Sequence, residues 1–400
     1  MAGAAQAHLA AQAHLVDAHC HGVYPGELGL GAFEARLPGT AAPGTTLFDS
    51  PSGFALRRWC PPLLGLEPHC PPARYLARRR ELGAYESARR LLRGAGIRAY
   101  VLDTGEPGDL TPPKDLAATA GAPVVETVRL EPLAQQVADT SGTVGSFLAN
   151  LAEAVHGAAL GAAGFSCAGD DAARHGGDAR PPGPVEVRQA AVAWLSARAV
   201  GERPDHPVLL RHLRWHAVAT GLPLLLRYRP AGEGPAAAGD FLRATAGLGA
   251  EVVLLPAEPH EAAAADLAAA LPHVYVGVGR DPAGVLGRTP FGKVLYASGV
   301  SGLPELAVSA AKGFLAELRR TVAERVRAGE WSAADGRHVT SLVAADNALR
   351  VFRLAEGGAR SAGGGARSAA PAGPADCGPA PRGPISCGPA SCGPVRPSAR

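Results

Sequence analysis

The sequence is poor in lysine, methionine and aromatic residues, and it has no long apolar run. Three lysines stand against 36 arginines, one methionine is present, and Phe, Trp and Tyr make up 5% of the 400 residues. No stretch reaches the roughly 18 consecutive apolar residues of a membrane-spanning helix, and the first residues lack the pattern of a secretory signal peptide. We therefore expect a cytoplasmic protein with no membrane partner.

Regular cysteine spacing and a strong charge imbalance are also absent. The seven cysteines are irregularly spaced and odd in number, which favours a reducing compartment over a disulfide framework. Residues 356–400 supply the formal net charge of +3, with five arginines against Glu356 and Asp376. The rest of the chain holds 34 basic and 34 acidic side chains, and this balance argues against a nucleic-acid partner.

What the sequence does contain is a repeated alternation of apolar, β-prone runs and helix-like stretches, with Gly or Pro at most junctions. The predicted strands lie near 14–18, 97–102, 123–130, 162–167, 222–228, 251–255, 273–278 and 293–297. The predicted helices lie at 73–93, 132–155, 188–220, 240–247, 260–270 and 304–328. Eight such units predict a single (β/α)8 barrel of the TIM type, although periodicity alone indicates only a parallel α/β fold.

The chain divides into an N-terminal extension (1–13), the barrel (14–355) and a C-terminal tail (356–400). The tail is rich in Gly, Pro, Ala and Arg and buries too little apolar surface to offset its ordering entropy, so we expect it to be disordered. Two further stretches, 22–72 and 168–187, follow the first and fourth predicted strands. Because the loops after strands build the active face of a barrel, we expect both to cover the site.

The first predicted strand ends in a His-x-His motif formed by His19 and His21. Side chains alternate along a strand, so both imidazoles are expected on one side and Cys20 on the other. Two neighbouring imidazoles suit one divalent metal such as zinc or manganese, but stable sites use three or four protein ligands. Further ligands are therefore needed at the ends of later strands.

Several segments together resemble the amidohydrolase-related (amidohydrolase 2) family, specifically its FluG-type branch, from about Leu15 to Leu354. The segments that carry the resemblance are 16–21, 96–105, 128–131, 221–224, 252–255, 290–296, 302–306 and 346–352. The resemblance implies a metal-dependent hydrolase of C–N or C–O bonds. Some relatives are fused to a glutamine-synthetase-like domain, so family analogy also suggests a glutamine-synthetase-like partner.

In this family the first-strand His-x-His binds the metal, further histidines follow strands five and six, and an Asp after strand eight is both ligand and base. Such a metal lowers the pKa of its bound water and polarises the scissile carbonyl. This chain departs from the pattern at four positions. Arg227 and Pro256 replace the two histidines, Gly299 replaces the Asp, and Ser166 replaces a Lys after strand four. Arginine cannot ligate a cation, and the catalytic residue is left unassigned.

Two interpretations of the remaining histidines stay open: a rebuilt metal site, or histidines that only form local hydrogen bonds. Replacement ligands could come from Cys20, Glu131, Glu258, His260 or the loop that holds Asp170, Asp171, His175 and Asp178. Arg227 puts a positive charge near the barrel mouth, where it could bind an anionic small molecule or pair with Glu258 or another acid.

Other polar residues have more ordinary expected roles. Asp103, Arg129 and Glu131 end strands two and three, so they are candidate substrate contacts or structural ion pairs. Glu305 follows Pro304 at a predicted helix start, where a capping role is expected. The arginine cluster at 78–80, 89, 90 and 93 is expected to form a solvated helix face, and His212 and His216 are expected at the surface.

Our leading hypothesis is an amidohydrolase-superfamily barrel with a degraded metal centre and weak or no hydrolase activity, which acts by binding a ligand. The first alternative is an active metal-dependent hydrolase with a rebuilt site. The second is a scaffold protein that binds a partner through its tail.

Overall fold

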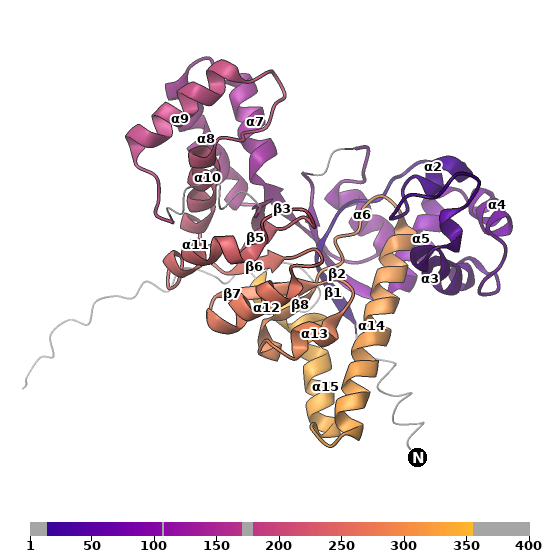
Figure 1. Ribbon diagram of the computed structural model, residues 1–400. Coiled ribbons are helices and arrows are strands. Elements are labelled where there is room, and N and C mark those ends of the chain that lie inside the picture. The colour runs from indigo at the N-terminus through magenta and orange to yellow at the C-terminus, as the bar shows by residue number, and fades with distance from the viewer. Residues whose placement is uncertain (1–13, 106–107, 170–178, 355–400) are drawn as a thin grey trace, which may run out of the picture. The chain divides into compact units, whose positions relative to one another are not determined.

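Eight parallel strands form a barrel surrounded by helices, as the sequence predicts (Figure 1). The structure is a computed structural model, and it describes residues 14–105, 108–169 and 179–354. The strands are β1 (Leu15–Cys20), β2 (Ile97–Asp103), β3 (Val124–Arg129), β4 (Gly164–Ala168), β5 (Leu224–Arg227), β6 (Val252–Leu255), β7 (Val274–Val278) and β8 (Val294–Tyr296). Each pairs with the next in sequence order. The TIM-barrel prediction is confirmed.

Residues that follow β8 close the barrel against β1. The Gly299 amide donates to the His19 carbonyl at 2.8 Å, and the His21 amide donates to the Val300 carbonyl at 2.8 Å. Inside, small and branched side chains such as Val16, Ala18 and Val101 fill the barrel, while a larger apolar layer lies between the strands and the helices. The carboxyl ends of all eight strands therefore meet at one mouth.

The helices cover the outside, and several are shorter than predicted. They are α2 (Leu30–Glu34), α3 (Pro51–Trp59), α4 (Pro72–Leu82), α5 (Ala84–Ala95), α6 (Pro113–Ala120), α7 (Leu130–Thr140), α8 (Val144–Ala159), α9 (Pro184–Ala197), α10 (Pro207–Ala219), α11 (Gly239–Ala244), α12 (Glu261–Ala270), α13 (Pro282–Leu286), α14 (Pro304–Arg327), α15 (Ala333–Ser341) and α16 (Asn347–Val351). The predicted helix at 73–93 breaks at Gly83. Its φ of +79° is a conformation that glycine adopts readily and that other residues disfavour. Thr143 caps a new helix within 132–155, and Pro207 starts one within 188–220.

The stretch 22–72 contains α2, α3 and two 3-10 turns, Leu47–Asp49 and Pro61–Leu64. α3 packs against α14, and the second 3-10 turn packs against α5. These helices lie beside α14 in Figure 1. Other contacts of the stretch reach the segments that follow β7 and β8 at the mouth side, since Arg280 donates to the Ser52 hydroxyl and the Tyr24 amide donates to the Gly302 carbonyl. Residues 170–178 of the predicted 168–187 loop, the N-terminal extension and the tail lie outside the described residues.

A buried ion pair fixes α4 to α14 and corrects two predictions. Arg79 Nε lies 2.8 Å from Glu305 Oε1, and the Tyr75 hydroxyl donates to the same oxygen at 2.8 Å. The side chains of Arg79 and Glu305 are 2% and 0% exposed. Arg79 therefore does not belong to a solvated face, and Glu305 is an ion-pair partner rather than only a helix cap.

His212 and His216 are half-buried, not surface residues as predicted, because α10 packs on α7, α8 and α9. Their ring centroids are 4.2 Å apart, and burial and His216 together lower the pKa of His212 to about 4. Among the described residues, no helix is both long and apolar enough to span a membrane.

Candidate functional site

A bulge in β1 turns both histidines of the His-x-His motif into the barrel mouth. Asp17 pairs with Tyr100 and Cys20 pairs with Leu102, so three steps along β1 match two steps along β2. The extra residue breaks the alternation and places His19 on the inner side. The His21 Nδ1 atom lies 3.0 Å from the Asp103 carbonyl oxygen, and the two imidazole rings are 5.0 Å apart.

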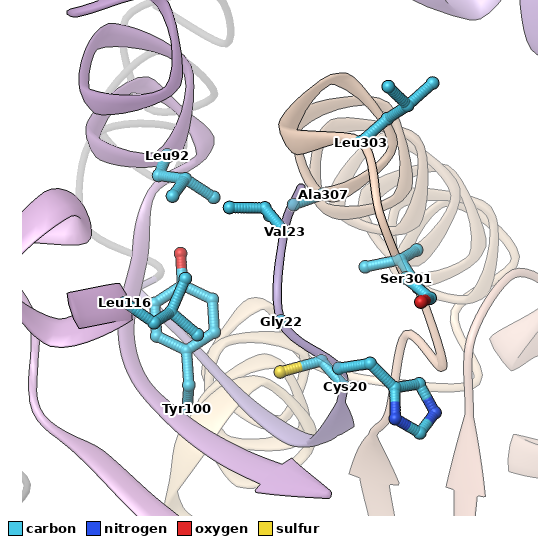
Figure 2. Close-up of a pocket in the computed structure, with 11 residues that line it drawn as sticks. Cys20, Gly22, Val23, Leu92, Tyr100, Leu116, Ser301, Leu303 and Ala307 are labelled. Carbon is cyan, nitrogen blue, oxygen red and sulfur yellow. The ribbon is translucent and has the colours of Figure 1, made fainter. Parts of the chain in front are cut away.

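Cys20 points the other way, as expected, into the layer between the strands and the helices. Figure 2 shows its sulfur pointing toward Tyr100 and Leu116, and Leu92 lines the same small space. Burial raises the pKa of this thiol well above its usual value. The space that these residues line is about 10 Å³, about one water molecule. Cys20 is thus neither a metal ligand nor part of a ligand pocket.

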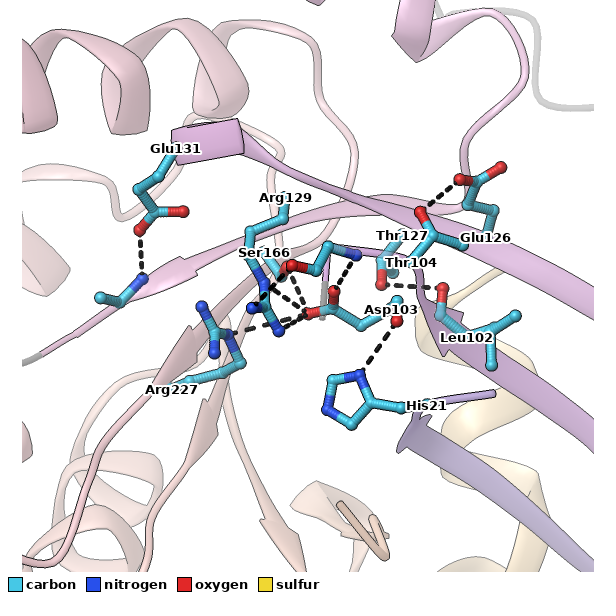
Figure 3. A network of polar contacts seen from close by, with 12 residues as sticks. His21, Leu102, Asp103, Thr104, Glu126, Thr127, Arg129, Glu131, Ser166 and Arg227 are labelled. Carbon is cyan, nitrogen blue, oxygen red and sulfur yellow. Dashed lines mark hydrogen bonds and ion pairs between the residues drawn. The ribbon is translucent and has the colours of Figure 1, made fainter. Parts of the chain in front are cut away.

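Asp103, at the end of β2, is the centre of the polar network in the mouth (Figure 3). Its Oδ2 accepts from the Ser166 hydroxyl at 2.7 Å and from Arg129 Nη2 at 3.1 Å, and its Oδ1 accepts from the Gly105 amide at 2.9 Å. Burial alone would raise the pKa of Asp103, but His19, Arg129 and the Ser166 hydrogen bond lower it to about 2. The carboxylate is therefore ionised at neutral pH.

Arg227, at the end of β5, brings a second guanidinium to the same carboxylate. Its Nε lies 3.7 Å from Asp103 Oδ2, with the side chain 25% exposed against 3% for Arg129. Arg227 pairs with an acid, as expected, and among the described residues that acid is Asp103 and not Glu258, because β2 and β5 face each other across the barrel interior. The Asp103 carboxylate therefore interacts with two guanidinium groups.

His19 is buried and stays neutral. Its Nδ1 has no hydrogen-bond partner among the described residues. Burial is the largest cause that lowers its pKa to about 3, and His21, Arg227 and Arg129 lower it further. A neutral imidazole can ligate a metal, but here it lies in a cationic environment.

The donors that the structure brings together do not fit a stable divalent-metal site. Within the described ranges, no group of three His, Cys, Asp or Glu side chains could hold an ion. The strand ends where the resemblance led us to expect ligands carry Arg227, Pro256 and Gly299, and the Gly299 amide donates to the His19 carbonyl. Asp103, the nearest carboxylate, is already held by two arginines and Ser166.

The proposed replacement ligands are not brought to His19 and His21. Glu131 is buried, and its Oε1 accepts from the Ala168 amide at 2.6 Å, while its Oε2 has no partner among the described residues. His260 precedes α12 and is held by a backbone bond from its amide to the Ala257 carbonyl. Asp170, Asp171, His175 and Asp178 lie outside the described residues.

Asp17 is a buried acidic residue that sequence analysis missed. It accepts hydrogen bonds from the Ser298 hydroxyl at 2.5 Å and the Ser298 amide at 2.9 Å, and burial raises its pKa to about 7. These bonds join β1 to the segment after β8, which positions His19 and Gly299 next to each other. An acidic residue within an apolar strand was the available signal.

Comparison with known proteins identifies the fold. No protein-family model matches the chain, and no curated protein matches it. A crystal structure from Lactobacillus casei ATCC 334, described as a metal-dependent hydrolase, is 20% identical with a TM-score of 0.71, over 86% of this chain and 96% of that one. Uronate isomerase from Thermotoga maritima is 15% identical with a TM-score of 0.61, over 87% and 97%. These two structures therefore share the barrel fold of this chain.

Proposed function

We propose that this chain is an amidohydrolase-superfamily barrel in which a cationic mouth has replaced the catalytic metal centre and binds a small anionic ligand. One observation carries the proposal: Arg129 and Arg227 share the single carboxylate of Asp103, and Arg227 is the more exposed of the two. Arginine stays protonated and matches the geometry of carboxylates and phosphates.

The position of Arg227 favours an anion over a cation. Arg129 lies closer to Asp103 and is almost fully buried, whereas Arg227 is farther from that carboxylate and partly exposed, so its positive charge is the one that a ligand can reach. At an effective dielectric constant of about 20, unit charges about 4 Å apart interact by about 4 kcal/mol. Arg227 would repel a divalent ion beside His19 and His21, and it would attract a carboxylate in the same place.

The ligand class we favour is a hydroxy acid of sugar size. The name of the Thermotoga maritima neighbour denotes a sugar acid as its substrate. In such a ligand the carboxylate would bind Arg227. His21 and Glu131 would be hydrogen-bonding groups for its hydroxyls. Among the described residues, no carboxylate takes the place of the Asp expected at Gly299, so we expect weak or no hydrolysis.

The alternative function is a metal-dependent hydrolase with a rebuilt site. It is favoured by the unpartnered Nδ1 of His19 and Oε2 of Glu131 within the described chain. It predicts about one zinc or manganese ion per chain. A third possibility, recruitment of a partner such as a glutamine-synthetase-like protein through residues 356–400, predicts that deletion of those residues abolishes the interaction.

Calorimetric titration with glucuronate tests the proposal, with glucose as the uncharged control. We expect saturable binding of glucuronate only, weakened about tenfold or more by Arg227→Gln. Arg243→Gln, at an exposed pair with Asp240, is the matched control and should bind as the parent does.

Metal content, measured by emission spectrometry after expression with added zinc and manganese, separates the anion-binding function from the hydrolase alternative. Near-stoichiometric metal that is lost in His19→Ala, together with no binding of glucuronate, phosphate or succinate, would overturn the anion proposal. Absence of metal together with anion binding would support it.

A further inference from the structure

Two histidines of α10 form a pair that has no part in the network at the mouth. His212 and His216 are four residues apart, which places their side chains next to each other on one face of the helix. Their ring centroids lie 4.2 Å apart, and the ring planes are tilted by 58°. The rings are therefore close neighbours that do not stack face to face, and one nitrogen of each can be directed to a shared position.

The ring nitrogens of this pair are accessible to solvent and have no protein partner. Both side chains are half-buried. Within the described part of the chain, neither ring forms a hydrogen bond or an ion pair, and none of their nitrogens is closed off from solvent. His19 at the mouth differs, because its Nδ1 is enclosed. A ligand that arrives from solvent can therefore reach His212 and His216.

Both imidazoles are neutral at pH 7, and the neutral ring is the form that binds a metal ion. Burial first, and then the neighbouring His216, lower the pKa of His212 to about 4, and burial also lowers the pKa of His216. Arginines help to lower the pKa of His19, whereas among the described residues no guanidinium group contributes at this pair. A cation beside α10 thus avoids the repulsion that Arg227 would exert at the mouth.

The packing of α10 holds the backbone of the pair in place. The helix contacts α7, α8, α9 and β5, and its opposite face buries Leu209, Leu213 and Ala217. Ligand groups on a packed helix need little ordering when they bind, so less of the binding free energy is lost to conformational entropy. Only the two rings have to adjust around an ion.

We propose that His212 and His216 bind one exchangeable divalent transition-metal ion that prefers imidazole, such as nickel, copper or zinc. Ring nitrogens about 2.0 Å from a shared ion lie about 3 Å apart, which is compatible with ring centroids 4.2 Å apart. No third His, Cys, Asp or Glu joins the pair within the described residues, so water fills the other coordination positions. The ion therefore exchanges readily, unlike one held by four protein ligands.

Nickel titration of the full chain with isotope-labelled histidine rings tests this proposal, because paramagnetic nickel broadens only nearby NMR signals. We expect the signals of His212 and His216 to broaden together. In His216→Gln the nickel concentration that broadens His212 should rise about tenfold or more, because the second bond of a chelate forms at high effective concentration. His338→Gln, at a single exposed histidine of α15, is the matched control and should leave that concentration unchanged.

His212→Gln is the reciprocal variant and should weaken broadening of His216 to the same extent. A circular dichroism spectrum equal to that of the parent shows that each variant has folded, and the titration of the parent decides the outcome if neither folds. Signals of His212 and His216 that stay sharp in excess nickel would overturn the proposal. Equal sensitivity of His212 in His216→Gln and in the parent, or broadening of His19 and His21 alone, would also overturn it.

Discussion

Two buried arginine–carboxylate clusters in this barrel differ in charge ratio and exposure. In the outer cluster, Arg79 alone pairs with Glu305, and both side chains are almost fully buried. In the mouth cluster, Arg129 and Arg227 share Asp103, and Arg227 is partly exposed. The first arrangement is a one-to-one pair closed to solvent, while the second places an additional guanidinium group, that of Arg227, near solvent.

The difference separates a structural role from a binding role. Removing one partner of a buried one-to-one ion pair destabilises the fold, because the other charge is left buried without a counter-charge. The guanidinium group of Arg227 at the end of β5 is not part of such a one-to-one pair, so a ligand can offset its charge. The contrast holds although both clusters consist of the same residue types.

The largest effect is expected from breaking the outer pair. Arg79→Met should lower the free energy of unfolding by about 3–5 kcal/mol, because Glu305 remains buried without a counter-charge. Urea denaturation measures this change. Arg320→Met, at the exposed pair with Glu324, is the control and should cost less than about 1 kcal/mol. A loss below about 1 kcal/mol for Arg79→Met would contradict a structural role for the pair.

Converting the mouth cluster should have the next largest effect. Arg227→His removes the surplus charge and adds a third imidazole opposite His19 and His21, which approaches the three-ligand set of catalytic zinc sites. We expect zinc affinity to rise by about a hundredfold or more, as measured by competition with a chromogenic chelator. Arg227→Gln, which removes the charge without adding a ligand, is the control. Equal zinc affinity in both variants would show that the introduced imidazole does not reach the ion.

Local sequence patterns predicted the strands and the mouth well. The eight apolar runs coincide with β1–β8, and Asp103, Arg129 and Arg227 lie at strand ends as predicted, because the parallel order brings all carboxyl ends to one face. The inward orientation of His19 was also predicted, but the bulge that produces it was not, since a bulge depends on the pairing of β1 with β2.

Partners across the fold could not be predicted from spacing. The acid that pairs with Arg227 is Asp103 and not Glu258, because barrel closure places β2 and β5 on the same interior. Arg79 reaches Glu305 because α4 lies beside the start of α14. Tertiary packing sets both partners, and spacing along the chain does not reveal it.

Removing the surplus charge should alter stability much less than breaking the outer pair. Arg227→Met leaves Asp103 with Arg129, Ser166 and the Gly105 amide, so its carboxylate stays partnered. We expect the free energy of unfolding to change by less than about 1 kcal/mol, from the same urea measurement as for Arg79→Met. A loss of about 3 kcal/mol or more would mean that Arg227 is structural, and the distinction between the two clusters would fail.

The smallest effect concerns the protonation of His19. Its pKa falls from 6.5 to about 3, chiefly by burial and His21 and further by Arg227 and Arg129. Between those values the unfolded chain binds a proton at His19 and the folded chain does not, so stability falls as pH decreases, by about 1.4 kcal/mol per pH unit at most. Arg227→Met removes one of the repelling charges and should raise the pKa of His19.

NMR titration of ring-labelled histidine measures this pKa directly, with the signal assigned by its loss in His19→Gln. The acid-dependent loss of stability should also shrink slightly in Arg227→Met. Arg243→Met, on the distant surface, should leave the pKa of His19 unchanged. If Arg227→Met leaves that pKa unchanged or lowers it, the charge of Arg227 does not act on the mouth, and the anion proposal loses its electrostatic basis.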